Sequence, residues 1–293
     1  MNSKPTLSHR NKEPESGVLY IVGTPIGNLS DTSFRSLDIL NNVDLIACED
    51  TRHTRKLMSK YKLNNNLISF NQYNSFNKIP KLIQQLELGK SIALVSDAGL
   101  PGISDPGEDL VKELRLKGLE TICIPGPCAA LTALVASGLP ASKFIFEGFL
   151  PKKKIDRDKV LIEISKNTKT TIIFESPHRL NKLLEDLEFY CGKNREIHIA
   201  RELTKKYEEH LRTNIEKSRN YFKNKKIVGE FTIILKGLDD KTLETFDQNV
   251  LKKDLCNLIN AGLSLSSAAK YLSKKENLPK NIIYNLYTKT NLD

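Results

Sequence analysis

Short apolar runs alternate with helix-like patterns along the first half of the chain. The apolar runs cover residues 18–22, 43–47, 92–95 and 121–124, and segments with a helical apolar period lie between them at 32–40, 51–61, 77–88 and 107–117. The runs are continuously apolar rather than alternating, which is typical of parallel strands covered by helices on both faces. The pattern therefore predicts an α/β domain over residues 17–137.

The second half repeats this pattern less regularly. Strands are predicted at 144–147, 170–174, 196–200 and 231–235, with a helix at 179–190, so that residues 138–237 form a second α/β domain. Residues 238–249 are polar and aperiodic, which indicates a linker. Three amphipathic segments follow at 250–260, 265–274 and 280–289. They predict a small helix-turn-helix-like module over 250–293, and a helical tail packed on the second domain is the alternative.

The N-terminal residues 1–16 are polar and lack the apolar centre of a secretory signal, so they are predicted to be a disordered tail. No apolar stretch approaches the roughly 18 residues of a membrane span. The five cysteines include no CxxC pair, which favours reduced thiols in the cytoplasm over a zinc site or a disulfide framework.

Three loops rich in glycine and proline follow predicted strands of the first domain. They begin at Gly23, Ser96 and Pro125. Ligands of open parallel sheets bind beyond the carboxyl ends of the strands, and glycine lets the backbone approach a ligand closely. One such loop is often only a tight turn, but three at one edge indicate a small-molecule site. The GxGxxG, GxSxG and HExxH motifs are absent, and Gly89-Lys90-Ser91 lacks the first glycine of a P-loop.

Two charged clusters also follow strands. The first is the segment 49–52 with Arg55, in which Asp50 and Thr51 are also natural helix caps. The second is the segment 175–179. Ser176 and Pro177 are expected to start a helix there, which would put His178 and Arg179 in a first turn, where a cation opposes the helix dipole.

The net charge of +10 is distributed unevenly along the chain. Residues 1–140 carry 15 basic and 14 acidic side chains, whereas residues 141–293 carry 30 and 21. The excess in the second half indicates an anionic partner, and a role in solubility alone is the alternative.

Eight segments in order resemble the tetrapyrrole methylase superfamily and, within it, the subfamily of 16S rRNA (cytidine-2′-O)-methyltransferases. They are VGTPIGNL, ACEDTRHTRKL, LVSDAGLPGISDPG, IPGPCAALTAL, FEGFLPKKK, FESPHR, ARELTKKYEE and GEFTIIL, running from Val22 to Leu235. The family usually has serine where this chain has Cys128, which is a nearly isosteric change.

The resemblance implies an α/β, bilobal tetrapyrrole-methylase-like fold with the cofactor cleft between two domains. It implies S-adenosyl-L-methionine as cofactor, a homodimer, no metal, and 16S rRNA or the small ribosomal subunit as partner, with no membrane or DNA involved. The cofactor-binding residues it implies are Thr24, Pro25, Ile26, Gly27, Ser96, Asp97, Ala98, Gly99, Pro127, Cys128, Ala129 and Ala130.

Methyl transfer to a ribose hydroxyl needs a positioned acceptor, and it is helped by a base that takes the proton or a cation that stabilises the alkoxide. The candidates for the acceptor end are Glu49, Asp50 and Arg52, with Glu175, His178 and Arg179 from the second domain. The residues expected to bind RNA are Lys152, Lys153, Lys154, Arg157, Arg201, Lys205 and Lys206, together with the C-terminal module. The competing interpretations are a tetrapyrrole C-methyltransferase of the same fold and a ribosome-assembly protein that binds RNA without chemistry.

Overall fold

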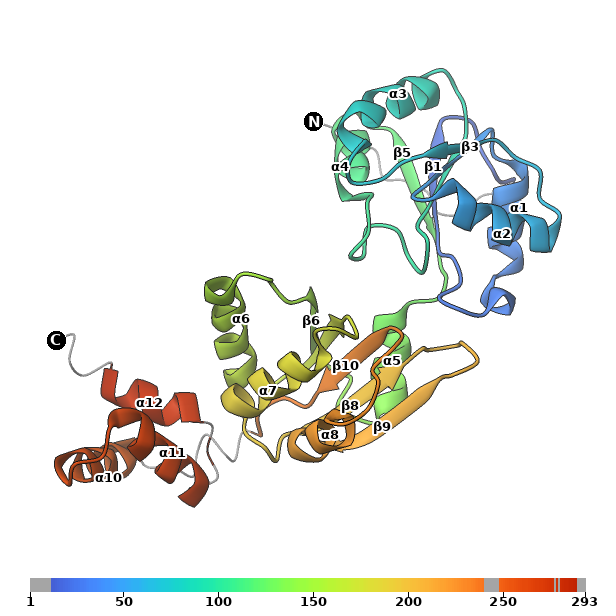
Figure 1. Cartoon of the computed structure of the whole chain (residues 1–293). Helices are drawn as coiled ribbons and strands as arrows, with labels where there is room; N and C mark the ends of the chain where they lie inside the picture. The colour runs from blue at the N-terminus through green and yellow to red at the C-terminus, as the bar shows by residue number, and fades with distance from the viewer. Residues whose placement is uncertain (1–11, 240–247, 277, 279, 289–293) are drawn as a thin grey trace. The chain divides into compact units, whose positions relative to one another are not determined.

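The computed structural model describes residues 12–239, 248–276, 278 and 280–288. The chain divides into two compact units, Met1–Ala129 and Ala130–Asp293 (Figure 1). Each unit is described by itself below.

The first unit is built on five parallel strands. The sheet order is β3-β2-β4-β1-β5, and every neighbouring pair in it is parallel. The elements in chain order are β1 (Val18–Val22), η1 (Leu29–Asp31), α1 (Phe34–Asn42), β2 (Leu45–Cys48), α2 (Thr51–Tyr61), β3 (Leu67–Ser69), α3 (Ser75–Glu87), β4 (Ile92–Val95), α4 (Glu108–Leu116) and β5 (Glu120–Ile124).

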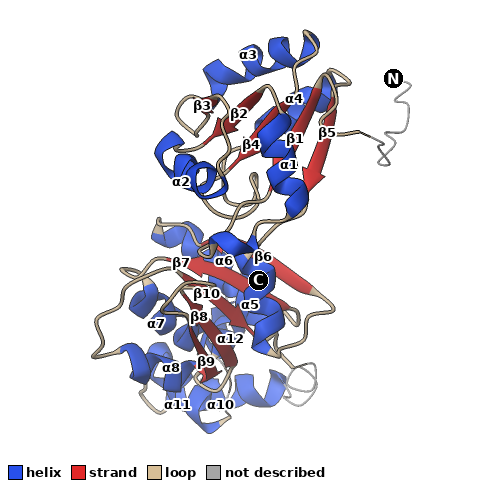
Figure 2. Ribbon diagram, turned by 90° about the vertical axis from the view of Figure 1, so that its right-hand side faces the viewer, coloured by secondary structure: helices blue, strands red, loops and turns tan. Residues whose placement is uncertain are grey.

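Helices cover both faces of this sheet, as the continuous apolar strands predict. On one face, Ile39 of α1 and Leu57 of α2 pack against Tyr20 of β1. On the other face, Leu82 of α3 and Leu110 of α4 pack with strand residues of opposite parity. In Figure 1 helices α3 and α4 lie on one side of the strands and α1 and α2 on the other, and Figure 2 shows the strands of this sheet in red from a view turned by 90°. The sheet is therefore buried on both faces, and its edges and loops remain for binding.

Part of the predicted disordered tail is ordered. The Arg35 guanidinium pairs with Glu13 at 2.7 Å, the Glu15 amide donates to the Tyr20 hydroxyl, and the Ser16 hydroxyl donates to the Gly89 carbonyl. These contacts hold residues 13–16 against the first unit, so the prediction was wrong for them. Residues 1–11 lie outside the described part of the chain.

The second unit contains a mixed sheet rather than a repeat of the first. Its order is β6-β7-β10-β8-β9, in which only the β6·β7 pair is parallel. The elements are α5 (Ala129–Ser137), β6 (Phe144–Phe149), α6 (Lys154–Lys166), β7 (Thr170–Glu175), α7 (Leu180–Cys191), β8 (Glu196–Arg201), β9 (Glu209–Asn214), α8 (Ile215–Phe222) and β10 (Phe231–Leu235).

One face of this sheet carries the core of the unit. Leu161 of α6, Leu184 of α7 and Phe222 of α8 pack there with Ile173 and Ile233 of the strands. Helix α5 also belongs to this unit, because the Arg212 guanidinium of β9 donates to the Ala136 carbonyl at 2.8 Å. The unit boundary at Ala129 thus precedes the one expected at residue 137.

The C-terminal helices form a third cluster with a core of its own. They are α10 (Gln248–Asn260), α11 (Leu265–Lys275) and α12 (Lys280–Thr288), and Leu255, Ala269 and Ile283 are completely buried among them. This core agrees with the predicted module, and α12 also packs on α7 with Lys280 Nζ 5.5 Å from the Phe189 ring centre, as the alternative of a packed tail expects. Gln248 and Asn249 are already helical, and residues 240–247 of the expected linker lie outside the described residues.

Candidate cofactor and acceptor site

The three glycine- and proline-rich loops leave adjacent strands. Strands β4, β1 and β5 are neighbours in the parallel sheet, so their carboxyl ends meet at one edge. Two of the loops are joined by backbone hydrogen bonds, because the Thr24 amide donates to the Gly99 carbonyl at 2.9 Å and the Gly99 amide donates to Thr24 at 3.1 Å. The loops predicted at positions 24–27 and 96–99 are thus brought together.

The first and third loops approach so closely that neither tolerates a side chain at the contact. A β-carbon at Gly23 would lie 2.7 Å from the α-carbon of Gly126, and one at Gly126 would lie equally close to Gly23. Gly99 has φ +84°, which L side chains rarely adopt. The glycines therefore leave backbone, rather than side chains, at this edge of the sheet.

Two buried hydroxyl groups fix these loops from inside. Thr24 Oγ1 donates to the Ser96 carbonyl at 3.2 Å, and Ser96 Oγ donates to the Gly99 carbonyl at 3.3 Å. Pro25 and Ile26 are buried, whereas Gly27 and Ala98 are exposed. Among the remaining predicted residues, Asp97, Pro127, Cys128 and Ala129 are half-buried, and Ala130 is buried within the second unit.

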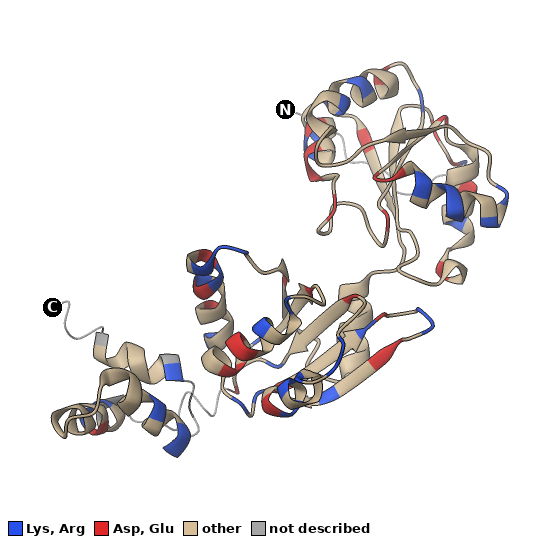
Figure 3. Cartoon of the chain, viewed as in Figure 1, with Lys and Arg blue, Asp and Glu red and all other residues tan. Residues whose placement is uncertain are grey.

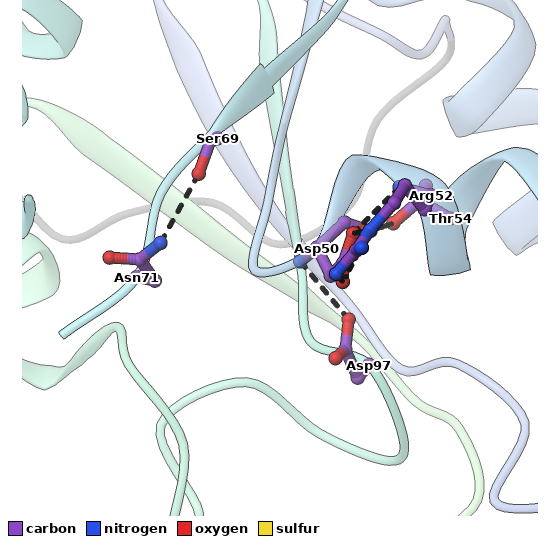
Figure 4. A network of polar contacts seen from close by, with 6 residues as sticks. All are labelled: Asp50, Arg52, Thr54, Ser69, Asn71 and Asp97. Carbon is purple, nitrogen blue, oxygen red and sulfur yellow. Dashed lines mark hydrogen bonds and ion pairs between the residues drawn. The ribbon is translucent and has the colours of Figure 1, made fainter. Parts of the chain in front are cut away.

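Asp50 has a structural role at the start of α2 (Figure 4). Its carboxylate caps the helix by accepting from the Arg52 amide at 2.8 Å and pairs with the Arg52 guanidinium at 2.6 Å. These hydrogen bonds lower the pKa of Asp50 to about 2. A carboxylate of such low basicity is a poor proton acceptor, so the cap interpretation accounts for Asp50.

Glu49 lies in a different environment. It lines an open hollow of about 560 Å³ together with Gln72, Ser75 and Asp105. Burial raises the pKa of Glu49, and the negative charge of Asp97 raises it further. Asp97 is fixed nearby, because its Oδ1 accepts the Asp50 amide at 3.1 Å (Figure 4).

Asp105 is the acidic residue that sequence reasoning missed. Burial, with the charge of Glu49 as the second cause, raises its pKa to about 6. The residue before it, Ser104, has φ +63°, a conformation that is uncommon outside glycine and marks backbone strain. Asp105 stands inside the quoted segment LVSDAGLPGISDPG, but nothing in that segment distinguishes it from Asp97 as a proton acceptor.

The acidic cluster has no metal-binding arrangement. Over the described residues, no group of three or more His, Cys, Asp or Glu side chains is placed to hold a metal ion. The perturbed carboxyl groups are candidates for proton transfer, because carboxylates with raised pKa values are suited to it near neutral pH.

The segment 175–179 forms a turn before α7 and does not start the helix. Arg179 is the N-cap residue and α7 begins at Leu180, so the expected helix start at Ser176 and Pro177 was wrong. The Arg179 amide is instead bonded to the Ser176 carbonyl at 3.1 Å, closing the turn. The argument from the helix dipole therefore does not apply to His178, which is exposed.

Glu175 and Arg179 tie this turn to the loop after β6. Glu175 is buried at the end of β7, accepts the Ser176 amide at 2.8 Å and pairs with Arg179 at 3.4 Å. The Arg179 guanidinium also donates to the Leu150 carbonyl at 2.7 Å. Both side chains are thus engaged within the second unit.

The residues predicted to bind RNA fall into two groups. Lys152, Lys153 and Lys154 are exposed at the start of α6, where Figure 3 shows a blue stretch of chain. Lys206 is exposed as well.

The cations of the second group are engaged internally. Arg157 is buried and donates to Asp186 at 2.8 Å. Arg201 pairs with Glu209 at 3.1 Å, and Lys205 pairs with Glu202 at 2.9 Å and with Glu230 at 2.8 Å.

Helix α2 also carries a basic surface, which the net charge of the first half does not reveal. Arg55, Lys56 and Lys60 are exposed on this helix (Figure 3). The acidic side chains of the loop after β4 and of α4 balance them in the total, so the near-neutral sum hides a local separation of charge.

Comparison with known proteins identifies the fold and the family. The family model described as Tetrapyrrole (Corrin/Porphyrin) Methylases matches residues 18–218. The chain belongs to this family. The solved structure of a cobalt precorrin-4 methyltransferase superposes with a TM-score of 0.58 at 15% identity, covering 75% of this chain and 95% of that one. Such low identity supports the shared fold alone.

Curated relatives are much closer in sequence. A protein of Halalkalibacterium halodurans named ribosomal RNA small subunit methyltransferase I is 43% identical over 286 residues, covering 96% of this chain and 98% of the relative. The protein of the same name from Thermotoga maritima is 47% identical over 221 residues, covering 75% of this chain and 99% of the relative.

Membership of the family fixes the class of cofactor. S-adenosylmethionine is the methyl donor of this chain, as in the family. The three-loop edge fits such a ligand, because Gly23 and Gly126 have no room for side chains and leave backbone groups accessible there. Among the described residues, no helix is long and apolar enough to cross a membrane.

Proposed function

We propose that this protein transfers a methyl group from S-adenosylmethionine to the ribose 2′-hydroxyl of a cytidine in 16S rRNA of the small ribosomal subunit. The observation that carries the proposal is the match over nearly the full length of relatives named as small-subunit rRNA methyltransferases. The exposed lysines at the start of α6 support an RNA substrate over a tetrapyrrole, since polyanions bind clustered cations.

The protein must remove a proton from the acceptor hydroxyl and align that hydroxyl with the donor methyl group. The bound donor supplies a methyl group on a positively charged sulfur, so no acid catalyst is needed. The acceptor hydroxyl ionises far above neutral pH and needs a base as its oxygen forms the new bond. Holding the reactants in line adds a contribution of about 7 kcal/mol in favourable cases.

Asp105 is the best base among the perturbed carboxyl groups. With a pKa of about 6 it is ionised at neutral pH yet remains basic enough to accept a proton. Glu49 supports this role, because its negative charge is one cause of the raised pKa of Asp105. The lower basicity of Asp50 removes it from the catalytic candidates.

The remaining predicted residues position the substrate. Glu175 and Arg179 hold the turn that presents His178, and Lys152–Lys154 and Lys206 contact phosphate groups. Arg52 stays with its partner Asp50. A homodimer is also proposed, and sedimentation of the full chain at several concentrations tests it.

The decisive experiment incubates the protein with small ribosomal subunits and radiolabelled S-adenosylmethionine, followed by mapping of the labelled nucleotide. Label on the ribose 2′-oxygen of one cytidine supports the proposal. Label on a base contradicts the assigned acceptor, and label on an added tetrapyrrole favours the rival enzyme class. Binding of RNA without any transfer would identify an assembly protein.

A further inference from the structure

The segment 202–208 connects β8 to β9, and of its residues only Lys206 has a role in the proposal above. It lies within the quoted motif ARELTKKYEE, whose cations were expected to contact phosphate. Arg201 and Lys205 instead pair with acidic residues of the same unit. The motif therefore needs a different explanation.

The backbone of this segment is held in a strained conformation. Glu202 has φ +52° and Thr204 has φ +64°, and for a β-branched residue such as threonine that conformation is a clear outlier. Strain of this kind persists only where the surroundings enforce it, and it gathers at functional sites.

Contacts with the loop before β10 hold the backbone of this segment in its strained conformation. The Glu202 amide donates to the Glu230 carbonyl at 2.9 Å, and the Glu230 amide donates back to the Glu202 carboxylate at 2.9 Å. Lys205 bridges both carboxylates. A β-carbon at Gly229 would lie 2.6 Å from Cγ of Glu202, so the two loops touch without spare room.

The rigid segment presents one aromatic ring to solvent. The Tyr207 side chain is 66% exposed, and Lys206 Nζ lies 5.5 Å from the centre of its ring. The neighbouring Glu208 carboxylate is 38% exposed and is held in place, because it accepts from the Thr204 amide and contacts His210. The Tyr207 ring is thus a flat apolar surface with the Lys206 cation beside it.

We infer that Tyr207 is a stacking platform for an unpaired base of the RNA substrate, with Lys206 against an adjacent phosphate. The inference rests on the proposed function. Aromatic side chains next to cations bind single-stranded RNA in this way, and the strained, tightly held backbone fixes the ring in advance. Double-stranded RNA has its bases stacked already, so the surface selects unpaired nucleotides.

The chain contains no tryptophan, so Tyr207→Trp creates a single fluorescent reporter at this position. The full-length variant is titrated with a mixed-sequence RNA oligonucleotide, either single-stranded or annealed to its complement. The single strand is expected to quench the indole emission to saturation, and the duplex to leave it unchanged. Phe34→Trp is the matched control, because Phe34 is 89% exposed on α1 of the near-neutral first unit.

Steady-state methylation of small subunits provides the second readout. Tyr207→Leu, which keeps apolar area but loses the flat ring, should raise KM for the subunit by about tenfold with little change in kcat. Tyr207→Phe should retain the wild-type KM. Gly229→Ala, which displaces Glu202, should raise KM as Tyr207→Leu does.

The outcomes separate this inference from the proposed function. An unquenched Tyr207→Trp and an unchanged KM in Tyr207→Leu, in a protein that still methylates small subunits, would overturn the stacking role alone. A wild-type protein that neither binds RNA nor methylates the subunit would overturn the proposed function, and the inference with it.

Discussion

At the scale of single residues, ionisation of Asp105 has opposite effects on catalysis and on stability. The ionised carboxylate is the form that accepts a proton, and it is also the form that destabilises the fold. Its folded-state pKa of about 6 lies above the ordinary value of 3.8. The folded protein therefore holds this proton more tightly than the unfolded chain does, and stability falls as the pH rises from about 4 to about 6. Above that range the ionised carboxylate is a constant cost to the fold.

Asp105→Asn should separate these two effects. At pH 8 the variant is expected to be more stable by about 1 kcal/mol, a value reduced because the group is partly exposed to solvent. The gain should shrink towards pH 4, where the wild-type side chain is neutral as well. Thermal unfolding at several pH values measures this, and equal stability at every pH would contradict the assigned environment.

The same substitution should remove proton acceptance. Single-turnover methyl transfer by the wild-type protein is expected to rise with pH through an apparent pKa near 6, the value of Asp105. Methyl transfer by Asp105→Asn should be much slower, and its rate should not rise with pH near 6. Asp50→Asn is the matched control, because asparagine also caps helices, and it should keep the profile. If Asp105→Asn had the wild-type dependence of rate on pH, another group would be the base.

At the scale of elements, the basic start of α6 is the clearest candidate contact with phosphate. Binding weakens as salt rises, so log affinity falls with log salt. Replacing Lys152, Lys153 and Lys154 by alanine should make this fall less steep, by about two to three units of slope. Lys159, which is exposed on the same helix and pairs with Asp156, offers a control whose replacement should change the slope less. An unchanged slope in the triple variant would exclude these lysines from the RNA contact.

The elements that the sequence predicted well are those with a clear apolar pattern of their own, a helical period in α2 and continuous apolar runs in the strands. Helix α2 and strands β1, β4 and β10 begin and end where the pattern places them. Helix α5 was missed because it is apolar all round, and α6 because a buried arginine, Arg157, stands on its core face. Edge strand β9 was missed because Leu211 is its single apolar residue.

The candidate site was predictable only in part for a related reason. The loops at Gly23, Ser96 and Pro125 are visible because glycine and proline mark them in the sequence. The raised pKa of Asp105 depends first on burial and then on the charge of Glu49, which a different strand, β2, brings to the same edge. A contact between residues far apart in the sequence leaves no local sequence pattern. The ion pairs of Arg157, Arg201 and Lys205 were missed for the same reason.

The C-terminal helices should be separable from the chemistry. The Thermotoga maritima relative is matched over 99% of its length and leaves a quarter of this chain without a counterpart. Helices α10–α12 have their own core, so a chain ending at Asp239 is expected to fold and bind S-adenosylmethionine normally. Its affinity for small subunits should fall. Equal subunit affinity in the truncated and full chains would deny the module a role in RNA binding.

At the scale of the whole molecule, several separate cores imply unfolding in more than one step. The buried clusters of the first sheet, the second sheet and the C-terminal helices share no residue. Calorimetry should therefore resolve more than one transition. A ligand at 100 times its Kd stabilises the part that binds it by about 2.7 kcal/mol.

S-adenosylmethionine should accordingly shift the transition of the first unit most, because the three loops belong to it. Gly99→Ala, which strains one loop, is the control and should weaken this shift. Equal shifts of all transitions would mean that the donor is held equally by both units.

The contact between Gly23 and Gly126 has a consequence for how this sequence can change over generations. A side chain lost at one position usually makes room for a larger one opposite, so paired sites drift together. Here both partners are already the smallest residue, and each added atom enters the same gap. A change at the opposite position cannot make room for the first, so we expect any variant that keeps this loop edge to keep both glycines.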